Sequence, residues 1–278
     1  MAYKSILTVV TGGTVEGAAL DGAVAMAEAQ DGHLEVLAMG LDASAPGYYY
    51  AGANAMIEQQ AIERARDEAS ETEAAVRTAL EGTPVRWSVT TGVAQIGTIQ
   101  HLVGGRARFS DLVVLPKPYG EGKTAADEAI VEAALFTGHV PVLVLPQGAK
   151  VRRPGKVVVA WNSSAEAIGA VRAAMPLLVS ADMVNIVVVD PPRHSADRSD
   201  PGGELSQMIA RHGAKPEVSV IAQTMPRTAD VIGRHCEDMQ GELLVMGAYG
   251  HSRFREALLG GATRDMLERA EIPVMMHH

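Results

Sequence analysis

The sequence predicts an α/β fold made of two doubly wound domains, and three observations indicate it. Short apolar runs alternate with longer helical patterns along the 278 residues, as in sheets built from strand–helix–strand units. The runs are continuous in Val, Ile and Leu, which is typical of parallel strands covered on both faces. The whole arrangement occurs twice, which indicates one domain in each half of the chain.

Three pairs of segments reveal the duplication. They are DLVVLP at 111–116 with ELLVMG at 242–247, HVPVLVLP at 139–146 with EIPVMMHH at 271–278, and KSILTVVT at 4–11 with GKVVVAWN at 155–162. The first two pairs are offset by 131 and 132 residues and the third by 151, so the first half carries about twenty extra residues in its middle. The stretch GAKVRRPGK at 148–156 is the predicted linker, which gives domains at 1–148 and 152–278.

The elements of the second half follow one another in a regular order. Strands are predicted at 156–161, 183–189, 217–223, 242–246 and 273–277, and helices at 164–179, about 203–212, 228–239 and 261–270. The first half shows the same alternation, except that its second helix is long, near 51–82, and accounts for the extra length.

Composition excludes several classes of protein. The net charge of −9 argues against a nucleic-acid binder or a binder of anionic membranes, because both partners favour basic patches. One cysteine, Cys236, excludes an intramolecular disulfide framework and fits a reducing compartment. The N-terminus has no long apolar stretch, and no segment approaches the ~18 apolar residues of a membrane span. We therefore expect a soluble, cytoplasmic protein with no nucleic-acid or membrane partner.

Open parallel sheets bind ligands beyond the carboxyl ends of their strands, at the topological switch point. The strand at 242–246 is followed by GAYGHSRFREALLGGAT at 247–263, with a helix predicted from about 261. The N-terminus of a helix favours phosphate, and Thr263 adds a hydroxyl to the first turn. From the glycines alone, a phosphate site and a simple set of tight turns remain equally open.

The corresponding loop of the first half, PKPYGEGKT at 116–124, looks at first like a phosphate-binding P-loop. The pattern G-x-x-x-x-G-K-[ST] requires a glycine at position 117, and that residue is Lys117. Pro116 and Pro118 also remove backbone N–H donors from the turn. We interpret Lys123 as a solvated or helix-start residue, with an anion contact as the alternative.

The second-half loop resembles the nucleotide-binding signature of the universal stress protein family, G-x2-G-x9-G-[ST]. Gly247, Gly250 and Gly260 have the spacing of that signature, and the ending ERAEIPVMM is similar to that of the family. The resemblance extends to both halves, so it implies a tandem, UspA-like protein. It also implies Rossmann-like domains with strand order 3-2-1-4-5, whose last strands pair within the chain as an intramolecular pseudo-dimer or across a homodimer axis.

The resemblance implies a nucleotide site in the second half, at positions matched one by one. These are Ala160, Trp161, Asn162, Ser164, Val188, Met246, Gly247, Gly250, Ser252, Gly260, Gly261, Ala262 and Thr263. Two positions depart from the family pattern: Gly261 replaces a Ser or Thr, and Asn162 replaces an acidic residue that accepts from the adenine amino group. Trp161 either stacks on the base or packs on the sheet, and Ser164 either caps a helix or reaches the nucleotide.

The first half departs further from the signature. Position 11 is Thr instead of Asp, and Pro116 stands where the second half has Gly247. We therefore expect a degenerate site in the first domain and an intact one in the second.

The function implied is that of a stress-response regulatory protein that binds ATP, AMP or ADP, with Mg²⁺ as a candidate companion ion. The main alternative is a scaffold of the same fold that binds partners and no nucleotide. An enzyme is a third reading, but no pairing of nucleophile and base is visible, so at most weak ATP hydrolysis is expected. No metal-binding cluster is expected either, because His277 and His278 alone are too few ligands.

Overall fold

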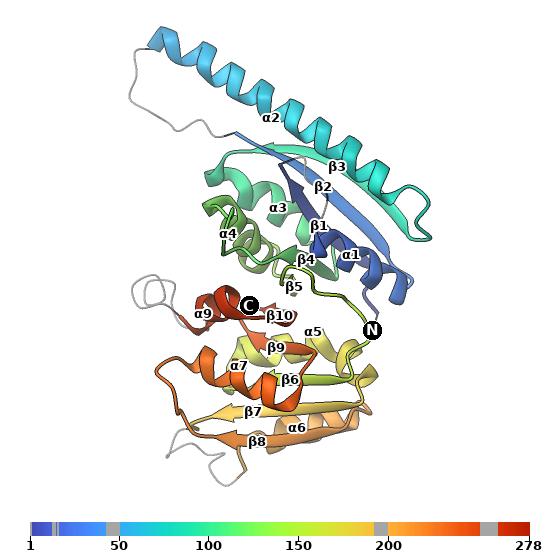
Figure 1. The fold of residues 1–278 in the computed structure, drawn as a ribbon, viewed down its shortest axis with the longest axis vertical. Helices are drawn as coiled ribbons and strands as arrows, with labels where there is room; N and C mark the ends of the chain where they lie inside the picture. Colours follow the sequence, from blue (N-terminus) through green and yellow to red (C-terminus); the bar gives the residue numbers. More distant parts are fainter. Residues whose placement is uncertain (1, 13–14, 16, 43–50, 192–199, 251–260) are drawn as a thin grey trace. The chain divides into compact units, whose positions relative to one another are not determined.

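The structure is a computed structural model that describes residues 2–12, 15, 17–42, 51–191, 200–250 and 261–278. Its contacts divide the chain into two compact units. The N-unit consists of Tyr3–Pro116 and Glu121–Val140, and the C-unit consists mainly of Lys117–Gly120 and Pro141–His278. Both units are α/β, as the sequence predicts (Figure 1).

The N-unit has a parallel sheet of four strands in the order β3-β2-β1-β4. Its strands are β1 (Ser5–Thr11), β2 (His33–Leu41), β3 (Arg86–Ala94) and β4 (Leu112–Pro116). Its helices are α1 (Ala18–Ala29), α2 (Ala51–Leu80), η1 (Ile96–Thr98), α3 (Ile99–Ala107) and α4 (Ala125–Glu132), the last continued by the π-turn η2 (Ala133–Thr137). The long helix α2 supplies the extra length, as expected.

The C-unit has a sheet in the order β5-β10-β9-β6-β7-β8. Its strands are β5 (Val142–Leu145), β6 (Lys156–Ala160), β7 (Met183–Val189), β8 (Pro216–Ile221), β9 (Leu243–Gly247) and β10 (Val274–His277). Its helices are α5 (Ala165–Ser180), α6 (Gly203–Arg211), α7 (Thr228–Met239) and α9 (Ala262–Arg269). Read from β8 to β10, the second half has the expected 3-2-1-4-5 order of parallel strands.

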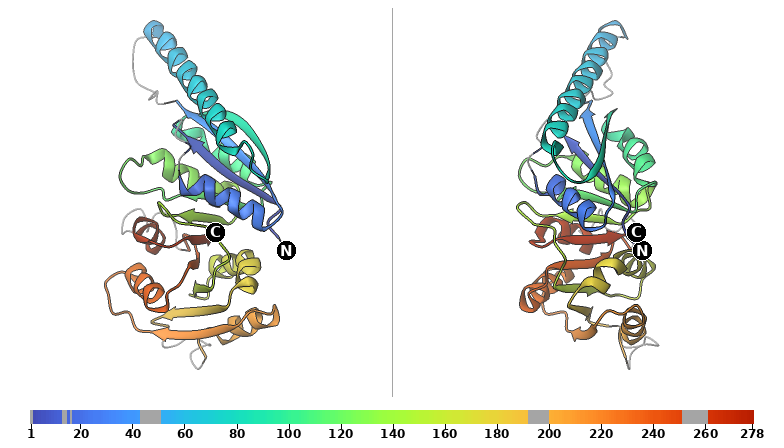
Figure 2. Two further views of the ribbon diagram at one scale, coloured as in Figure 1. Left: turned by 45° about the vertical axis from the view of Figure 1, so that its right-hand side comes forward. Right: turned by 90° about the vertical axis from the view of Figure 1, so that its right-hand side faces the viewer.

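Helices cover both faces of the C-unit sheet (Figures 1 and 2). Helices α5 and α6 lie on one face, and α7 and α9 lie on the other. The inner strands are accordingly buried, with Leu243, Leu244 and Val245 of β9 all at most 3% exposed, whereas the edge strand β8 has exposed residues, among them Val220 at 52%. The prediction of two-sided burial is therefore confirmed for the inner strands and is wrong for the edge strand β8.

Strand β5 comes from the first half of the sequence but belongs to the C-unit. It pairs antiparallel with β10, with Val144 opposite Val274 and Leu143 opposite Met275. This pairing confirms the expectation that the last strands of the two halves join within the chain.

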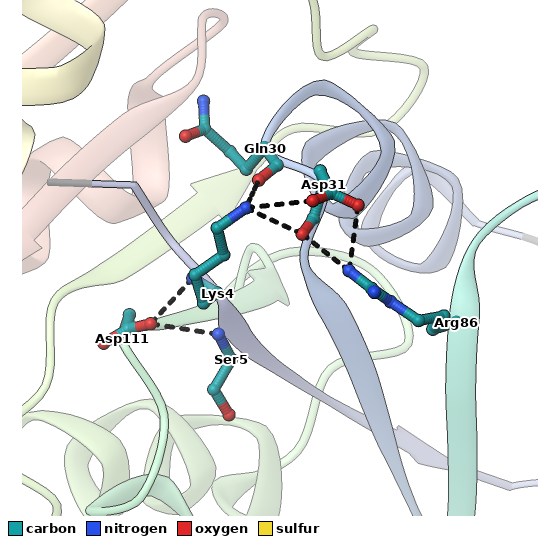
Figure 3. A network of polar contacts seen from close by, with 6 residues as sticks. All are labelled: Lys4, Ser5, Gln30, Asp31, Arg86 and Asp111. Atoms are coloured by element: carbon teal, nitrogen blue, oxygen red, sulfur yellow. Dashed lines mark hydrogen bonds and ion pairs between the residues drawn. The ribbon is translucent and has the colours of Figure 1, made fainter.

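The duplication is also visible at the amino ends of the strands. Asp111, just before β4, accepts hydrogen bonds from the backbone N–H groups of Lys4 (2.7 Å) and Ser5 (2.9 Å) at the start of β1 (Figure 3). Glu242, just before β9, accepts from the N–H of Gly155 (2.6 Å), directly before β6. The two acids are 131 residues apart, which is the offset of the repeat.

None of the helices in the described part of the chain combines the length and the apolar composition that a membrane span requires.

Candidate functional site

The candidate site lies where β6 and β9 end side by side in the C-unit. Ala160, the last residue of β6, pairs with Met246 in β9 on one side and with Val187 in β7 on the other. Chain direction through the sheet reverses here, because the chain passes from β6 outward to β8 and then returns to β9. This is the topological switch point at which open α/β sheets hold ligands.

The turn from β6 into α5 is fixed by its own polar groups. Trp161, which is half-buried, donates its backbone N–H to Val187 O (2.9 Å). The side-chain oxygen of Asn162 accepts from Ser164 N (3.1 Å), and Ser163 between them has a left-handed backbone (φ 60°). Ser164 Oγ accepts from Ala167 N (3.1 Å), so Ser164 is the N-cap of α5.

Gly247 is required by packing between β9 and α5. A Cβ at this position would lie 2.6 Å from Ala167 N and 2.8 Å from the carbonyl carbon of Glu166. These are backbone atoms at the start of a helix, so no side chain can move aside. The packing of β9 against α5 therefore explains the first glycine of the signature without reference to a ligand.

The loop after β9 is tied to β10 and to α9. Ala248 donates its N–H to His277 O (2.9 Å) and accepts from His278 Nδ1 (3.0 Å) through its carbonyl oxygen. Tyr249, with φ 55°, donates its N–H to Thr263 Oγ1 (3.0 Å). The backbone N–H groups of Ala248 and Tyr249 are thus already bonded within the protein.

Helix α9 begins at this same edge of the sheet. Gly261 is its N-cap, with extended backbone angles of φ −76° and ψ 156°. Ala262 is exposed, while Thr263 is only 3% exposed because its hydroxyl joins α9 to the β9 loop. The hydroxyl accepts the bond from Tyr249, so it keeps its own proton as a donor.

Glu166 is a site residue that the sequence reasoning missed. Its Oε2 would be 3.2 Å from a Cβ built on Gly250, and Ser164 Oγ would be 3.9 Å from the same point. A carboxylate in the first turn of α5 stabilises that helix. In the sequence, only its position two residues after the Ser164 cap indicates that Glu166 would face the loop after β9.

The other expected residues fall into two groups. Val188 and Met246 are core residues, each 6% exposed, at the ends of β7 and β9. Ser252 and Gly260 lie outside the described residues, so their places in the site are not described. Within the described part of the chain, no group of three or more His, Cys, Asp or Glu is arranged to hold a metal ion.

The P-loop-like segment of the first half serves to start a helix. Thr124 caps α4, and its side chain accepts from Ala126 N (3.3 Å). The carboxylate of Asp127 accepts from Thr124 N (2.9 Å) and pairs with Lys123 Nζ (3.0 Å). The interpretation of Lys123 as a helix-start residue is therefore confirmed.

Comparison with known proteins gives a family match for the second half of the chain. A model of the universal stress protein family matches residues 154–278. A curated universal stress protein of Synechocystis is 27% identical over 168 residues, which span 59% of this chain and 57% of that protein. The alignment thus covers little more than half of the relative's own length.

Two solved structures are similar over nearly the whole chain. One is a universal stress protein from Archaeoglobus fulgidus, with a TM-score of 0.64 and 15% identity, covering 97% of this chain and 94% of that chain. The other is a putative universal stress protein from Pseudomonas aeruginosa, with a TM-score of 0.61 and 18% identity, covering 99% and 92%. At this identity they support the fold alone, and the family match assigns residues 154–278 to the universal stress protein family.

Proposed function

We propose that this chain is a stress-response regulatory protein that binds an adenine nucleotide, ATP or AMP, in its second half. One observation supports this most: the β6 turn, the β9 loop and the N-terminus of α9 meet at the switch point of the C-unit sheet. That junction offers a sheet edge for a base and a helix N-terminus for phosphates.

In this proposal the base lies against the end of β6. Ala160 and Trp161 border it, and Val188 supplies backbone groups along its edge. Asn162 accepts from the adenine amino group with the second lone pair of its side-chain oxygen, since the first is used by Ser164 N. Ser164 remains primarily the cap of α5.

The phosphates lie between Gly250 and the first turn of α9. Since the N–H groups of Ala248 and Tyr249 are already bonded, the donors left to the proposal are Gly250 and the first residues of α9, Gly261 to Thr263. The signature also assigns Ser252 and Gly260 to this cradle. If Mg²⁺ accompanies ATP, Glu166 is the carboxylate placed to contact it, together with phosphate oxygens.

We propose that the first domain does not bind nucleotide. Glu68 of α2 extends its carboxylate to the ends of β1 and β2, where Oε2 accepts from Leu41 N (3.4 Å). Its Oε1 lies 4.0 Å from the place of a Cβ on Gly12. A negative side chain at this edge disfavours an anionic ligand.

The alternative function is that of a scaffold whose clefts bind no nucleotide. The carboxylate of Glu166 beside Gly250 favours it, because in the absence of a cation this charge repels a phosphate. Titration of the full chain with ATP separates the two functions. The full chain is needed because β5 and Lys117–Gly120 belong to the same compact unit as the second half.

The site itself is tested by restoring the missing hydroxyl. Gly261 already has the extended backbone of a serine N-cap, so Gly261→Ser requires no change in backbone conformation. If phosphate lies at this helix end, the hydroxyl adds a hydrogen bond to a charged group of about 1.5 kcal/mol, or roughly tenfold in ATP affinity by calorimetry.

Gly261→Ala is the matched control, since it adds a carbon without the hydroxyl and is expected to bring no gain. Equal affinity for the Ser and Ala variants would place the phosphates elsewhere. No heat from ATP with either variant or with the unaltered chain would favour the scaffold.

A further inference from the structure

A short segment of the first half of the sequence lies along helix α9 of the C-unit. This segment, Lys117–Gly120, directly follows β4, yet its contacts group it with the C-unit. We refer to it as the strap. It is anchored at its start, where Lys117 donates its backbone N–H to Leu145 O (3.1 Å) in β5.

Lys117 caps the C-terminal end of α9. Its Nζ donates to Glu268 O (2.9 Å) and to Ala270 O (3.1 Å). The last carbonyls of a helix have no partner within the helix, so the ammonium group satisfies two of them and opposes the negative end of the helix dipole. Burial lowers the pKa of Lys117, while the charge of Glu271 acts in the opposite direction.

Tyr119 contacts the other end of the same helix. The guanidinium of Arg264, in the first turn of α9, lies over the Tyr119 ring at 5.1 Å from its centroid. Arg264 also donates through Nε to Glu268 Oε1 (3.0 Å), one turn further on. The strap therefore contacts α9 in both its first and its last turn.

Support from α7 complements the strap. Arg227 pairs with Asp265 (3.7 Å), and Arg269 pairs with Asp230 (3.3 Å). Helix α9 has eight residues, a length at which a helix is not stable without tertiary contacts. Its direction is therefore set by α7 and by the strap.

We propose that the strap is a positioning element for the phosphate site, because it holds α9 so that the N-terminal N–H groups of this helix face the ligand. The first half of the chain thereby affects the nucleotide affinity of the second half. This inference rests on the proposed function. Direct attraction by Lys117 contributes little, because eight residues of helix place it about 12 Å from the phosphates, beyond a Debye length at physiological salt.

The test uses the full chain and calorimetry with AMP and adenosine. Lys117→Met keeps the length of the side chain and removes its donors, and we expect AMP affinity to fall about tenfold with little change for adenosine. Lys117→Arg, which retains donors and charge, is expected to keep most of the affinity. Lys123→Met is the matched control, because this nearby lysine contacts Asp127 of its own helix.

Each outcome either supports or contradicts the proposed role of the strap. A selective loss for AMP, restored by Arg at position 117, supports the strap. Unchanged AMP affinity in Lys117→Met overturns it and leaves the proposed function intact, whereas equal losses for AMP and adenosine overturn it by indicating a general defect. Absence of AMP binding in the unaltered chain instead refutes the proposed function, and the strap's role with it.

If Lys117→Met does not fold, the affinities for AMP and adenosine are compared in Tyr119→Ala instead. It removes the ring beneath Arg264 and is expected to weaken AMP more than adenosine. Equal binding of AMP by this variant and the unaltered chain would overturn the inference.

Discussion

Asp31 shows how a single exposed residue joins three elements of the N-unit. It follows α1 with a left-handed backbone (φ 46°), and its carboxylate pairs with Lys4 Nζ (3.3 Å) from the start of β1 and Arg86 Nη2 (2.9 Å) from β3 (Figure 3). The hydrogen bond from Lys4, followed by the charges of Arg86 and Lys4, lowers the pKa of Asp31.

The sign of this shift predicts a pH dependence. A carboxyl whose pKa is lowered by folding stabilises the protein above its unfolded-state value of 3.8, and the contribution is lost as pH falls through the lower folded-state value. Asp31→Asn removes the charge and tolerates the left-handed backbone. We expect this variant to have a lower urea midpoint than the unaltered chain at pH 7, and we expect the difference to shrink as the pH falls below 3.8.

Measuring Asp31→Asn and the unaltered chain at two pH values separates the effect of the ion pairs from that of the backbone turn. If Asp31→Asn is equally destabilised at pH 7 and at pH 3, the effect comes from the backbone turn, and the ion pairs contribute nothing.

Residues that bear directly on the site were predictable to different degrees. The glycine spacing locates the β9 loop, and Ser164 is visible as a helix cap before α5. Glu166 and the bond from Tyr249 N to Thr263 depend on how two separate loops meet, which no local pattern contains.

At the scale of elements, packing of α5 on β9 explains why Gly247 tolerates no side chain. Gly247→Ala would place its Cβ 2.6 Å from a backbone nitrogen, so α5 must shift. We expect a loss of about 1–3 kcal/mol in unfolding free energy, measured by urea denaturation.

Gly233 in α7 provides the contrasting variant. Apart from its chain neighbours and the backbone of its own helix, no described atom lies within 4 Å of a Cβ built there, and the residue lies inside a helix. Gly233→Ala is expected to raise the unfolding free energy by up to about 1 kcal/mol. If Gly247→Ala is as well tolerated as Gly233→Ala, the close approach of α5 to β9 is wrong.

The positions of most helices and strands could be predicted from the sequence, because buried parallel strands appear as continuous runs of apolar residues. Strands β6, β7 and β9 begin and end within one residue of the predicted bounds, and α2 ends two residues before the predicted limit. The strap was not predictable, because Lys117 and Tyr119 act on carbonyls and on an arginine about 150 residues away in the sequence.

At the scale of the whole molecule, the two halves of the sequence do not coincide with the two compact units. Strand β5 and the strap, both from the first half, belong to the C-unit. The predicted linker is also held there, since Arg152 pairs with Glu242 (2.7 Å) and Arg153 with Asp182 (2.6 Å). A repeat in the sequence marks duplicated elements, but contacts decide which unit each element joins.

This division predicts how the isolated second half behaves. A fragment of residues 152–278 lacks β5, so one edge of β10 is left without its partner. An unpaired edge strand is a template for pairing with another copy, and we expect the fragment to self-associate in sedimentation velocity.

Adding a peptide of residues 139–149, which contains β5, is expected to reduce this association. A fragment that stays monomeric without the peptide would mean that β10 does not depend on β5.

We propose that each chain holds one adenine nucleotide, in its second half. Calorimetric titration of the full chain with ATP tests it most directly, and we expect one nucleotide per chain. Gly260→Val is expected to reduce affinity at least a hundredfold through the loss of two or three hydrogen bonds to phosphate, while Lys123→Ala leaves binding unchanged. Two nucleotides per chain, or binding lost with Lys123→Ala and kept with Gly260→Val, would contradict the claim.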